Sequence, residues 1–221
     1  MNNIRRRQTI LLILSLVSIG CFVTIASLLQ GQQIARFDSS VIAFVQGMER
    51  PWLTSLMELV SFIGSTRVVI AITLICLFLF YKFLKHRMEL ILFVTLIAGT
   101  AVLNRQLKLL FQRDRPILHR LAEEAGFSFP SGHSMIAFAM YASLSFLLWR
   151  HVPTRKGRTI VLVCSILMIL LIGISRIYLG VHYPSDVVAA YFASGFWFAL
   201  CVWIFQWYME KRYNQKKPAS V

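Results

Sequence analysis

The chain of 221 residues is 57% hydrophobic and only 14% charged, with a mean hydropathy of +0.68. This composition excludes an ordinary soluble domain and predicts a membrane protein. The formal net charge of +14 does not indicate nucleic-acid binding, because the basic residues lie at the ends of long apolar runs and form no basic stripe. All four cysteines lie inside apolar segments, with spacings that fit neither a metal site nor a disulfide framework: Cys21, Cys76, Cys164 and Cys201.

Long apolar runs recur along the chain, and about 20 apolar residues in a helix cross a bilayer core. They predict six transmembrane helices, near residues 9–29, 67–84, 88–107, 134–150, 159–177 and 186–208. We expect the first run to be a retained anchor, because it is longer than a usual signal core and lacks a small-residue cleavage site. The predicted fold is all-α: one polytopic membrane domain of six transmembrane helices over residues 1–221.

The segment between the first two spans is expected to lie at the membrane surface. Its apolar residues are interrupted too often for a span, at Glu49, Pro51 and Glu58. Apolar side chains nevertheless recur there at helical spacing: Leu53, Leu56, Met57, Val60 and Ile63. We therefore expect a short amphipathic interfacial helix, or more than one, within residues 37–63.

The distribution of Lys and Arg predicts the orientation. Four short segments hold 14 of the 23 basic residues: 5–7, 82–87, 150–158 and 211–217. Because short cytoplasmic loops retain positive charge, we expect both termini in the cytoplasm and the chain in the cytoplasmic membrane. Four ionisable residues then lie at helix ends on the extracytoplasmic face, where they can converge in one pocket: Lys108, His133, Arg176 and His182.

The first of three candidate segments contains cations. Lys108 and Arg115 are seven residues apart, so a helix that continued to Pro116 would place them on one face. Together with Arg176 they can neutralise a phosphate dianion, since arginine matches phosphate oxygens in a bidentate fork. Taken alone, Lys108 and Arg115 are also typical of side chains that extend from a span to the interface.

The second segment, Pro130-Ser131-Gly132-His133, precedes an apolar run. Ser131 is expected to be the N-cap, and Gly132 lets the backbone approach a ligand closely. Free N–H groups at a helix start form an anion site, to which His133 adds a proton donor. The alternative is an ordinary capped helix start.

The third segment is the most specific. His182 precedes Pro184, which we place in the first turn of the last helix, and Asp186 follows His182 by four residues. Asp186 can then accept a hydrogen bond from one imidazole nitrogen and leave the other free to attack phosphorus. A lone His–Asp pair at a helix start is more often structural, but this pair accompanies two other segments. Arg113, His119 and Arg120 are expected in a solvated loop; alternatively, Arg113 and Arg120 hold the second phosphate of a diphosphate.

The three segments together resemble the signature of the type 2 phosphatidic acid phosphatase superfamily, in its membrane lipid phosphatase branch. The matching patterns are Lys108-x6-Arg115-Pro116, Pro130-Ser131-Gly132-His133 and Ser175-Arg176-x5-His182-x3-Asp186. The resemblance implies that His182 forms a phosphohistidine, that Asp186 holds His182, and that His133 protonates the leaving oxygen. The phosphoryl oxygens would be bound by five residues: Lys108, Arg115, Arg176, Ser131 and Gly132. No metal and no other cofactor is expected.

The expected function is hydrolysis of the terminal phosphate of a membrane lipid. Resemblance to small bacterial members implies phosphatidylglycerophosphate or undecaprenyl diphosphate, with phosphatidic acid as a further substrate. The expected partners are this lipid and the bilayer, without nucleic acid and without an obligate protein partner. A phosphotransferase that passes the group to a lipid or sugar acceptor is the alternative, and a transporter or phospholipid-binding protein does not explain the two histidines and the carboxylate. The superfamily that the three segments resemble also contains soluble bacterial acid phosphatases and vanadium haloperoxidases. The haloperoxidase branch is disfavoured because its members are soluble.

Overall fold

The computed structural model describes residues 2–84, 87–117 and 119–216. Helices are the regular elements of this part of the chain, and it contains no strand, which confirms the predicted all-α fold class. They are α1 (Asn2–Ser27), α2 (Gln32–Gln46), α3 (Pro51–Ile63), α4 (Thr66–Leu84), α5 (Arg87–Phe111), α6 (Gly132–His151), α7 (Arg155–Tyr178) and α8 (Pro184–Lys216).

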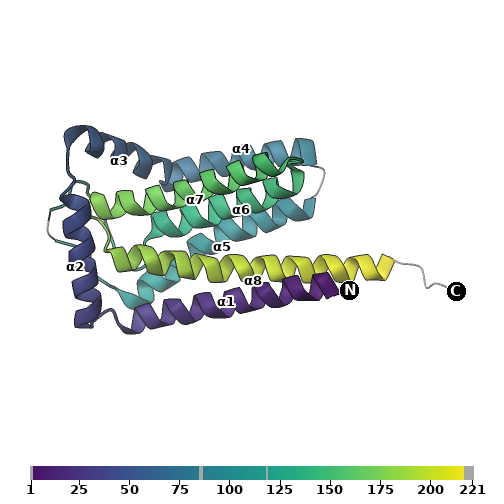
Figure 1. The fold of residues 1–221 in the computed structure, drawn as a ribbon, viewed down its shortest axis with the longest axis horizontal. Coiled ribbons are helices and arrows are strands. Elements are labelled where there is room, and N and C mark those ends of the chain that lie inside the picture. The colour runs from purple at the N-terminus through teal and green to yellow at the C-terminus, as the bar shows by residue number, and fades with distance from the viewer. Residues whose placement is uncertain (1, 85–86, 118, 217–221) are drawn as a thin grey trace.

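Six of these helices are long and apolar enough to cross a membrane, namely α1, α4, α5, α6, α7 and α8. They run side by side as a bundle in Figure 1. α1 packs along α8, and α6 contacts α5, α7 and α8. Large apolar side chains point outward along the bundle, such as Leu16, Phe78 and Ile160. A bilayer accommodates this surface, whereas water would not.

The segment between the first two spans folds as two helices, not as one continuous helix. α2 ends at Gln46 with Gly47 as its C-cap, and α3 begins with Pro51 in its first turn, where proline's missing N–H leaves no hydrogen bond unmade. α2 lies across the end of the bundle, and α3 leads from α2 into α4 (Figure 1). Both contact α7, and buried Val45 and Met57 pack against the end of α7 and the start of α8.

Several helix termini meet at the end of the bundle under α2, where α1 also ends (Figure 1). α5 and α7 end there, while α6 and α8 begin there. The connection between α5 and α6 is held against this end by Phe129, which is fully buried and whose ring packs against Phe22 and Phe111. α1 begins and α8 ends at the opposite end of the bundle (Figure 1).

One close approach fixes α7 against α8. A side chain at Gly173 would collide with the hydroxyl of Tyr191, which donates a hydrogen bond to the carbonyl oxygen of Ile169 at 2.8 Å. The helices therefore meet closely just below the end of the bundle, where α7 carries Arg176 and α8 carries Asp186.

Candidate active site

The three segments singled out in the sequence meet at this end of the bundle. Lys108 lies in the last turn of α5 and Arg176 in the last turn of α7. Ser131, Gly132 and His133 form the start of α6, and Asp186 lies in the first turn of α8. Arg115 and His182 lie on the connections that precede α6 and α8. All eight residues therefore belong to one region of the fold.

His182 and Asp186 are both fully buried and lie next to each other as a histidine–carboxylate pair. Nδ1 of His182 lies 3.5 Å from Oδ2 of Asp186. The same carboxylate oxygen accepts a hydrogen bond from the hydroxyl of Ser128 and another, at 2.9 Å, from the backbone N–H of Tyr183. The hydroxyl of Ser128 also lies 3.3 Å from Nδ1 of His182. These partners assign the proton of the neutral imidazole to Nδ1, which leaves Nε2 unprotonated and able to accept a hydrogen bond from Nη1 of Arg115.

Burial makes His182 a neutral base. Loss of hydration lowers the pKa of His182 to about 3, and the nearby Arg115 and Arg176 charges add to the shift. Asp186 acts in the opposite direction without restoring an ordinary value. His182 is consequently unprotonated at neutral pH, which is the form that a nucleophile requires.

Three groups converge on a single carboxylate next to His182. Glu124, in the connection between α5 and α6, forms an ion pair with Nη2 of Arg176. Its Oε2 also lies 3.5 Å from Nη1 of Arg115, and its Oε1 lies 3.7 Å from Nδ1 of His133. Lys108 is within electrostatic reach of Arg115 and Arg176. The carboxylate therefore occupies a site built for an anion.

Arg115 does not lie on a helix, although the sequence suggested that a helix could continue from Lys108 to Pro116. Helix α5 ends at Phe111 and does not continue to Pro116, so Arg115 reaches the site from an irregular segment. Its guanidinium donates hydrogen bonds to four backbone carbonyl groups, those of residues 125, 126, 127 and 181. The Nη1 group also faces Nε2 of His182 at 3.3 Å. Arg115 thus shapes the loop as well as contributing positive charge beside the anion position.

The start of α6 is capped as predicted. The Ser131 hydroxyl accepts hydrogen bonds from the N–H and the hydroxyl of Ser134, and the Ser131 N–H donates to the backbone carbonyl of Asp186 at 3.2 Å. A Cβ at Gly132 would lie only 3.0 Å from Oδ1 of Asn104. Gly132 therefore allows close packing against α5, while phosphate binding by Ser131 and Gly132 stays a prediction.

Sequence reasoning missed several residues of the site. Ser128 and Glu124 lie in the loop before α6, where no spacing rule draws attention to them. Arg113 does not belong to a solvated loop: its guanidinium contacts the carboxylates of Asp186 and Asp38 and lies 4.0 Å from the Tyr183 ring centroid. Asp38 lies among polar neighbours in the run Arg36-Phe37-Asp38-Ser39-Ser40, so its place in the sequence did not indicate a role in the site.

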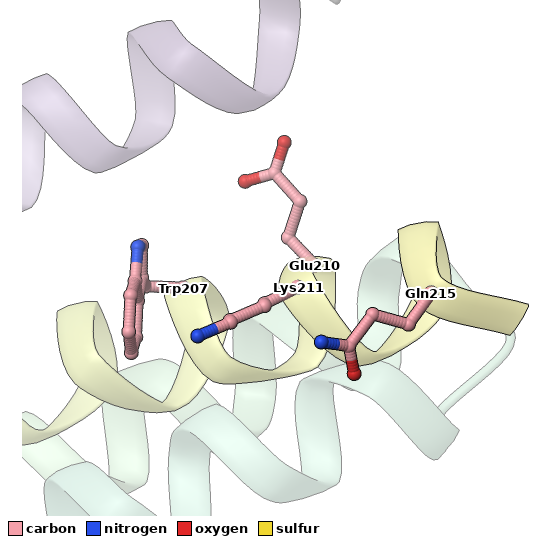
Figure 2. Close-up of a pocket in the computed structure, with 4 residues that line it drawn as sticks. All are labelled: Trp207, Glu210, Lys211 and Gln215. Carbon is pink, nitrogen blue, oxygen red and sulfur yellow. The ribbon is translucent and has the colours of Figure 1, made fainter.

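A solvent-facing hollow lies elsewhere, near the far end of α8 (Figure 2). It is lined by Trp207, Glu210, Lys211 and Gln215. Glu210 accepts a hydrogen bond from Gln8 of α1 at 2.8 Å, which ties the two helices together. The described residues that line this hollow include no histidine and no arginine, whereas both kinds of side chain gather under α2. We therefore place the candidate active site at the other end of the bundle.

Within residues 2–84, 87–117 and 119–216, no group of three or more His, Cys, Asp or Glu side chains is arranged to hold a metal ion. The site brings together three cationic side chains, Lys108, Arg115 and Arg176, which suit an anionic ligand. Independence from metals stays a prediction.

Comparison with known proteins identifies the family. A family model described as the PAP2 superfamily matches residues 89–210. Phosphatidylglycerophosphatase B of Bacillus subtilis (strain 168) is 30% identical over 174 residues, which cover 77% of this chain and 84% of the relative. Phosphatidylglycerophosphatase B of Escherichia coli (strain K12) is 41% identical over 87 residues, 38% of this chain and 31% of the relative.

A solved structure shares the whole fold. The crystal structure of a transmembrane PAP2 type phosphatidylglycerolphosphate phosphatase from Bacillus subtilis superposes with a TM-score of 0.76 at 24% identity. The match covers 94% of this chain and 98% of the solved one. Its extent confirms the six-span architecture that the sequence predicts. The chain is a multi-pass membrane protein that belongs to the PAP2 superfamily.

Proposed function

We propose that this protein is a lipid phosphatase that removes the terminal phosphate of a lipid phosphate or diphosphate through a phosphohistidine on His182. One observation carries the proposal. An anionic group, the carboxylate of Glu124, is held by Arg115, Arg176 and His133, and the same Nη1 of Arg115 lies 3.3 Å from the unprotonated Nε2 of His182. A phosphoryl group that replaced this carboxylate would lie beside a neutral nucleophile.

The first step transfers the phosphoryl group to the enzyme. Nε2 of His182 attacks phosphorus, a N–P bond forms, and the bond between phosphorus and the lipid oxygen breaks. His133 gives a proton to the leaving oxygen, so the product is a neutral alcohol or a lipid monophosphate. Asp186 stabilises the positive charge that the imidazole acquires, and Arg115 and Arg176 stabilise the charge on the equatorial oxygens.

The second step releases phosphate. His133, now unprotonated, takes a proton from a water molecule as the water oxygen attacks phosphorus. The N–P bond breaks, its electron pair returns to Nε2 of His182, and inorganic phosphate leaves. His133 is again protonated for the next cycle. No step requires a metal, since cationic side chains supply the charge stabilisation, and we propose that the reaction is metal-independent.

We propose phosphatidylglycerophosphate as the first substrate to test, because the two relatives described above bear that activity in their names. The site lies at helix ends, where lipid tails can remain beside the apolar bundle while the head group reaches the cations. The Lys and Arg distribution supports an extracytoplasmic site with both termini in the cytoplasm of the producing cell.

The test is phosphate release by purified, detergent-solubilised protein with a chelator present. Phosphatidylglycerophosphate, undecaprenyl diphosphate and phosphatidic acid are compared in the wild type and in His182→Ala. His119→Ala is the matched control, because His119 is an exposed histidine that pairs with Glu49. The proposal expects release in the wild type and the control, and none in His182→Ala. Loss of substrate without free phosphate, together with a phosphorylated acceptor, would indicate a phosphotransferase instead.

A further inference from the structure

One buried carboxylate connects α2 to the candidate active site. The side chain of Asp38 is only 3% exposed, although α2 is outside the six spans. Its Oδ1 accepts a hydrogen bond from the N–H of Ser185 at 2.8 Å, and its Oδ2 accepts one from the Ser185 hydroxyl at 2.7 Å. Asp38 therefore places negative charge at the N-terminal turn of α8, where the helix dipole favours it.

Arg113 links this carboxylate to the one that holds His182. Its Nη2 donates to Oδ2 of Asp38 at 2.9 Å, and its Nη1 donates to Oδ1 of Asp186 at 2.6 Å. The guanidinium also lies against the ring of Tyr183. The planar fork can thus hold two carboxylates at once, which the single ammonium group of a lysine does less well.

The arrangement divides the two oxygens of Asp186 between two tasks. Oδ2 faces His182, Ser128 and the N–H of Tyr183, whereas Oδ1 is occupied by Arg113. A carboxylate buried to this extent loses its hydration, so its ionised form needs a fixed positive partner. Arg113 is that partner, and Asp38 compensates its charge and fixes its orientation.

We propose that Asp38 and Arg113 are positioning residues, which keep Asp186 ionised and aimed at His182. The proposal rests on the proposed role of His182 as nucleophile. Neither residue needs to touch the substrate: Arg113 acts through Asp186, and Asp38 acts through Arg113. The interfacial helix α2 thereby becomes part of the catalytic machinery, and loss of its anchoring carboxylate changes the chemistry at His182.

The alternative is that the two ion pairs only attach α2 to α8. The two roles differ in how activity depends on pH. The ionisable groups facing this cluster are His182 and Tyr183 beside α8, Arg113, Asp114 and Arg115 before α6, Lys108 on α5 and Asp38 on α2. Removing the positive charge of Arg113 leaves ionised Asp186 less favoured, so Asp186 takes up a proton at higher pH and activity falls earlier on acidification.

The experiment measures kcat and KM against pH for the wild type, Arg113→Gln, Arg113→Lys and Asp38→Asn. We expect kcat of Arg113→Gln to fall at least about tenfold at pH 7, with KM changed less than about twofold. An opposite charge at this distance lowers the pKa of a carboxyl group by about one to three units. The acid limb of the kcat profile of Arg113→Gln should therefore move to higher pH by that amount. Arg113→Lys should restore part of the shift, and Asp38→Asn should give a smaller loss than Arg113→Gln.

The control is Arg150→Gln, which removes an arginine–carboxylate pair of 3.2 Å with Glu89 at the opposite end of the bundle. Thermal unfolding in detergent and inhibition by inorganic phosphate show whether each variant is folded with an intact anion site. Lower melting temperatures with wild-type pH profiles in Arg113→Gln and Asp38→Asn would overturn the proposal. If His182→Ala retains activity, the proposed function itself fails. If His182→Ala is inactive while the Arg113 and Asp38 variants behave like the wild type, only the positioning role fails.

Discussion

Removing the carboxylate of Glu124 should strengthen anion binding, because this group occupies the position proposed for the phosphoryl group. It contacts Arg115, Arg176 and His133. A substrate must displace it, and the observed affinity is reduced by the fraction of molecules in which the site is open. Glu124→Gln keeps the size of the side chain while removing its charge.

The expected magnitude follows from these contacts. Opposite charges about 4 Å apart attract each other by about 1–4 kcal/mol, between the limits of bulk water and a protein surface. The Glu124 side chain is 26% exposed and its loop must be ordered to reach the site, so we take a value near the lower limit. About 1.4 kcal/mol corresponds to a tenfold change in binding. We therefore expect Glu124→Gln to lower the inhibition constant of inorganic phosphate by about tenfold.

The assay is competitive inhibition by inorganic phosphate at pH 7, which reports anion binding without the chemical step. Glu123→Gln is the matched control, because it removes the same charge from an exposed position one residue earlier. An equal change in both variants would mean that only the general charge of the loop matters. An unchanged or weaker inhibition in Glu124→Gln would refute the assignment of this position as the anion site.

Three further predictions concern other parts of the fold. Because burial lowers the pKa of His182 to about 3, its imidazole should stay neutral from pH 8 down to pH 5. An NMR titration tests this, with the His182 signal assigned by comparison with His182→Gln. An inflection of that signal near pH 6.5 would contradict the prediction. Ser128→Ala removes a hydrogen bond to Asp186 and should reduce kcat by roughly five- to tenfold in steady-state assays, while phosphate inhibition stays unchanged. Gly173→Ala should destabilise the protein by about 1–3 kcal/mol in unfolding experiments, since Tyr191 leaves no room for a methyl group, whereas Gly20→Ala, with open space around it, should not.

The six spans could be predicted because apolar runs of membrane length leave few alternatives. Small differences at their ends follow from local chemistry. Helix α8 runs to Lys216, beyond the predicted end of the last span, because the sequence past residue 208 contains no helix-breaking residue before Pro218. Helix α5 includes Lys108 but stops at Phe111, ahead of the proline that was expected to end it.

The convergence of Lys108, His133, Arg176 and His182 at one end of the bundle also followed from sequence. The number of crossings between them fixes which helix ends share a side, whatever their separation along the chain. Contacts that depend on the path of a loop could not be inferred in this way. Glu124 reaches the cations only because the connection before α6 folds back, with the Ser128 N–H bonded to the carbonyl of Arg113 at 2.7 Å.

Arg113 shows why a residue in a charged loop cannot be judged by composition alone. Its neighbours in sequence are polar, which predicts solvent exposure, yet its partners Asp38 and Asp186 come from two distant helices. Asp38 is similar: a single acid on α2 has meaning only once α2 lies across the start of α8. Tertiary contacts of this kind leave no periodic pattern in the sequence.

The central claim is that His182 carries the phosphoryl group. The most direct measurement is to mix the enzyme rapidly with a lipid phosphate labelled with ³²P in its terminal phosphate, quench in alkali, and map the labelled peptide by mass spectrometry. The account predicts an acid-labile, alkali-stable label on His182, formed and lost at rates compatible with turnover and absent in His182→Ala. Full turnover by His182→Ala, or a label on another residue, would contradict it.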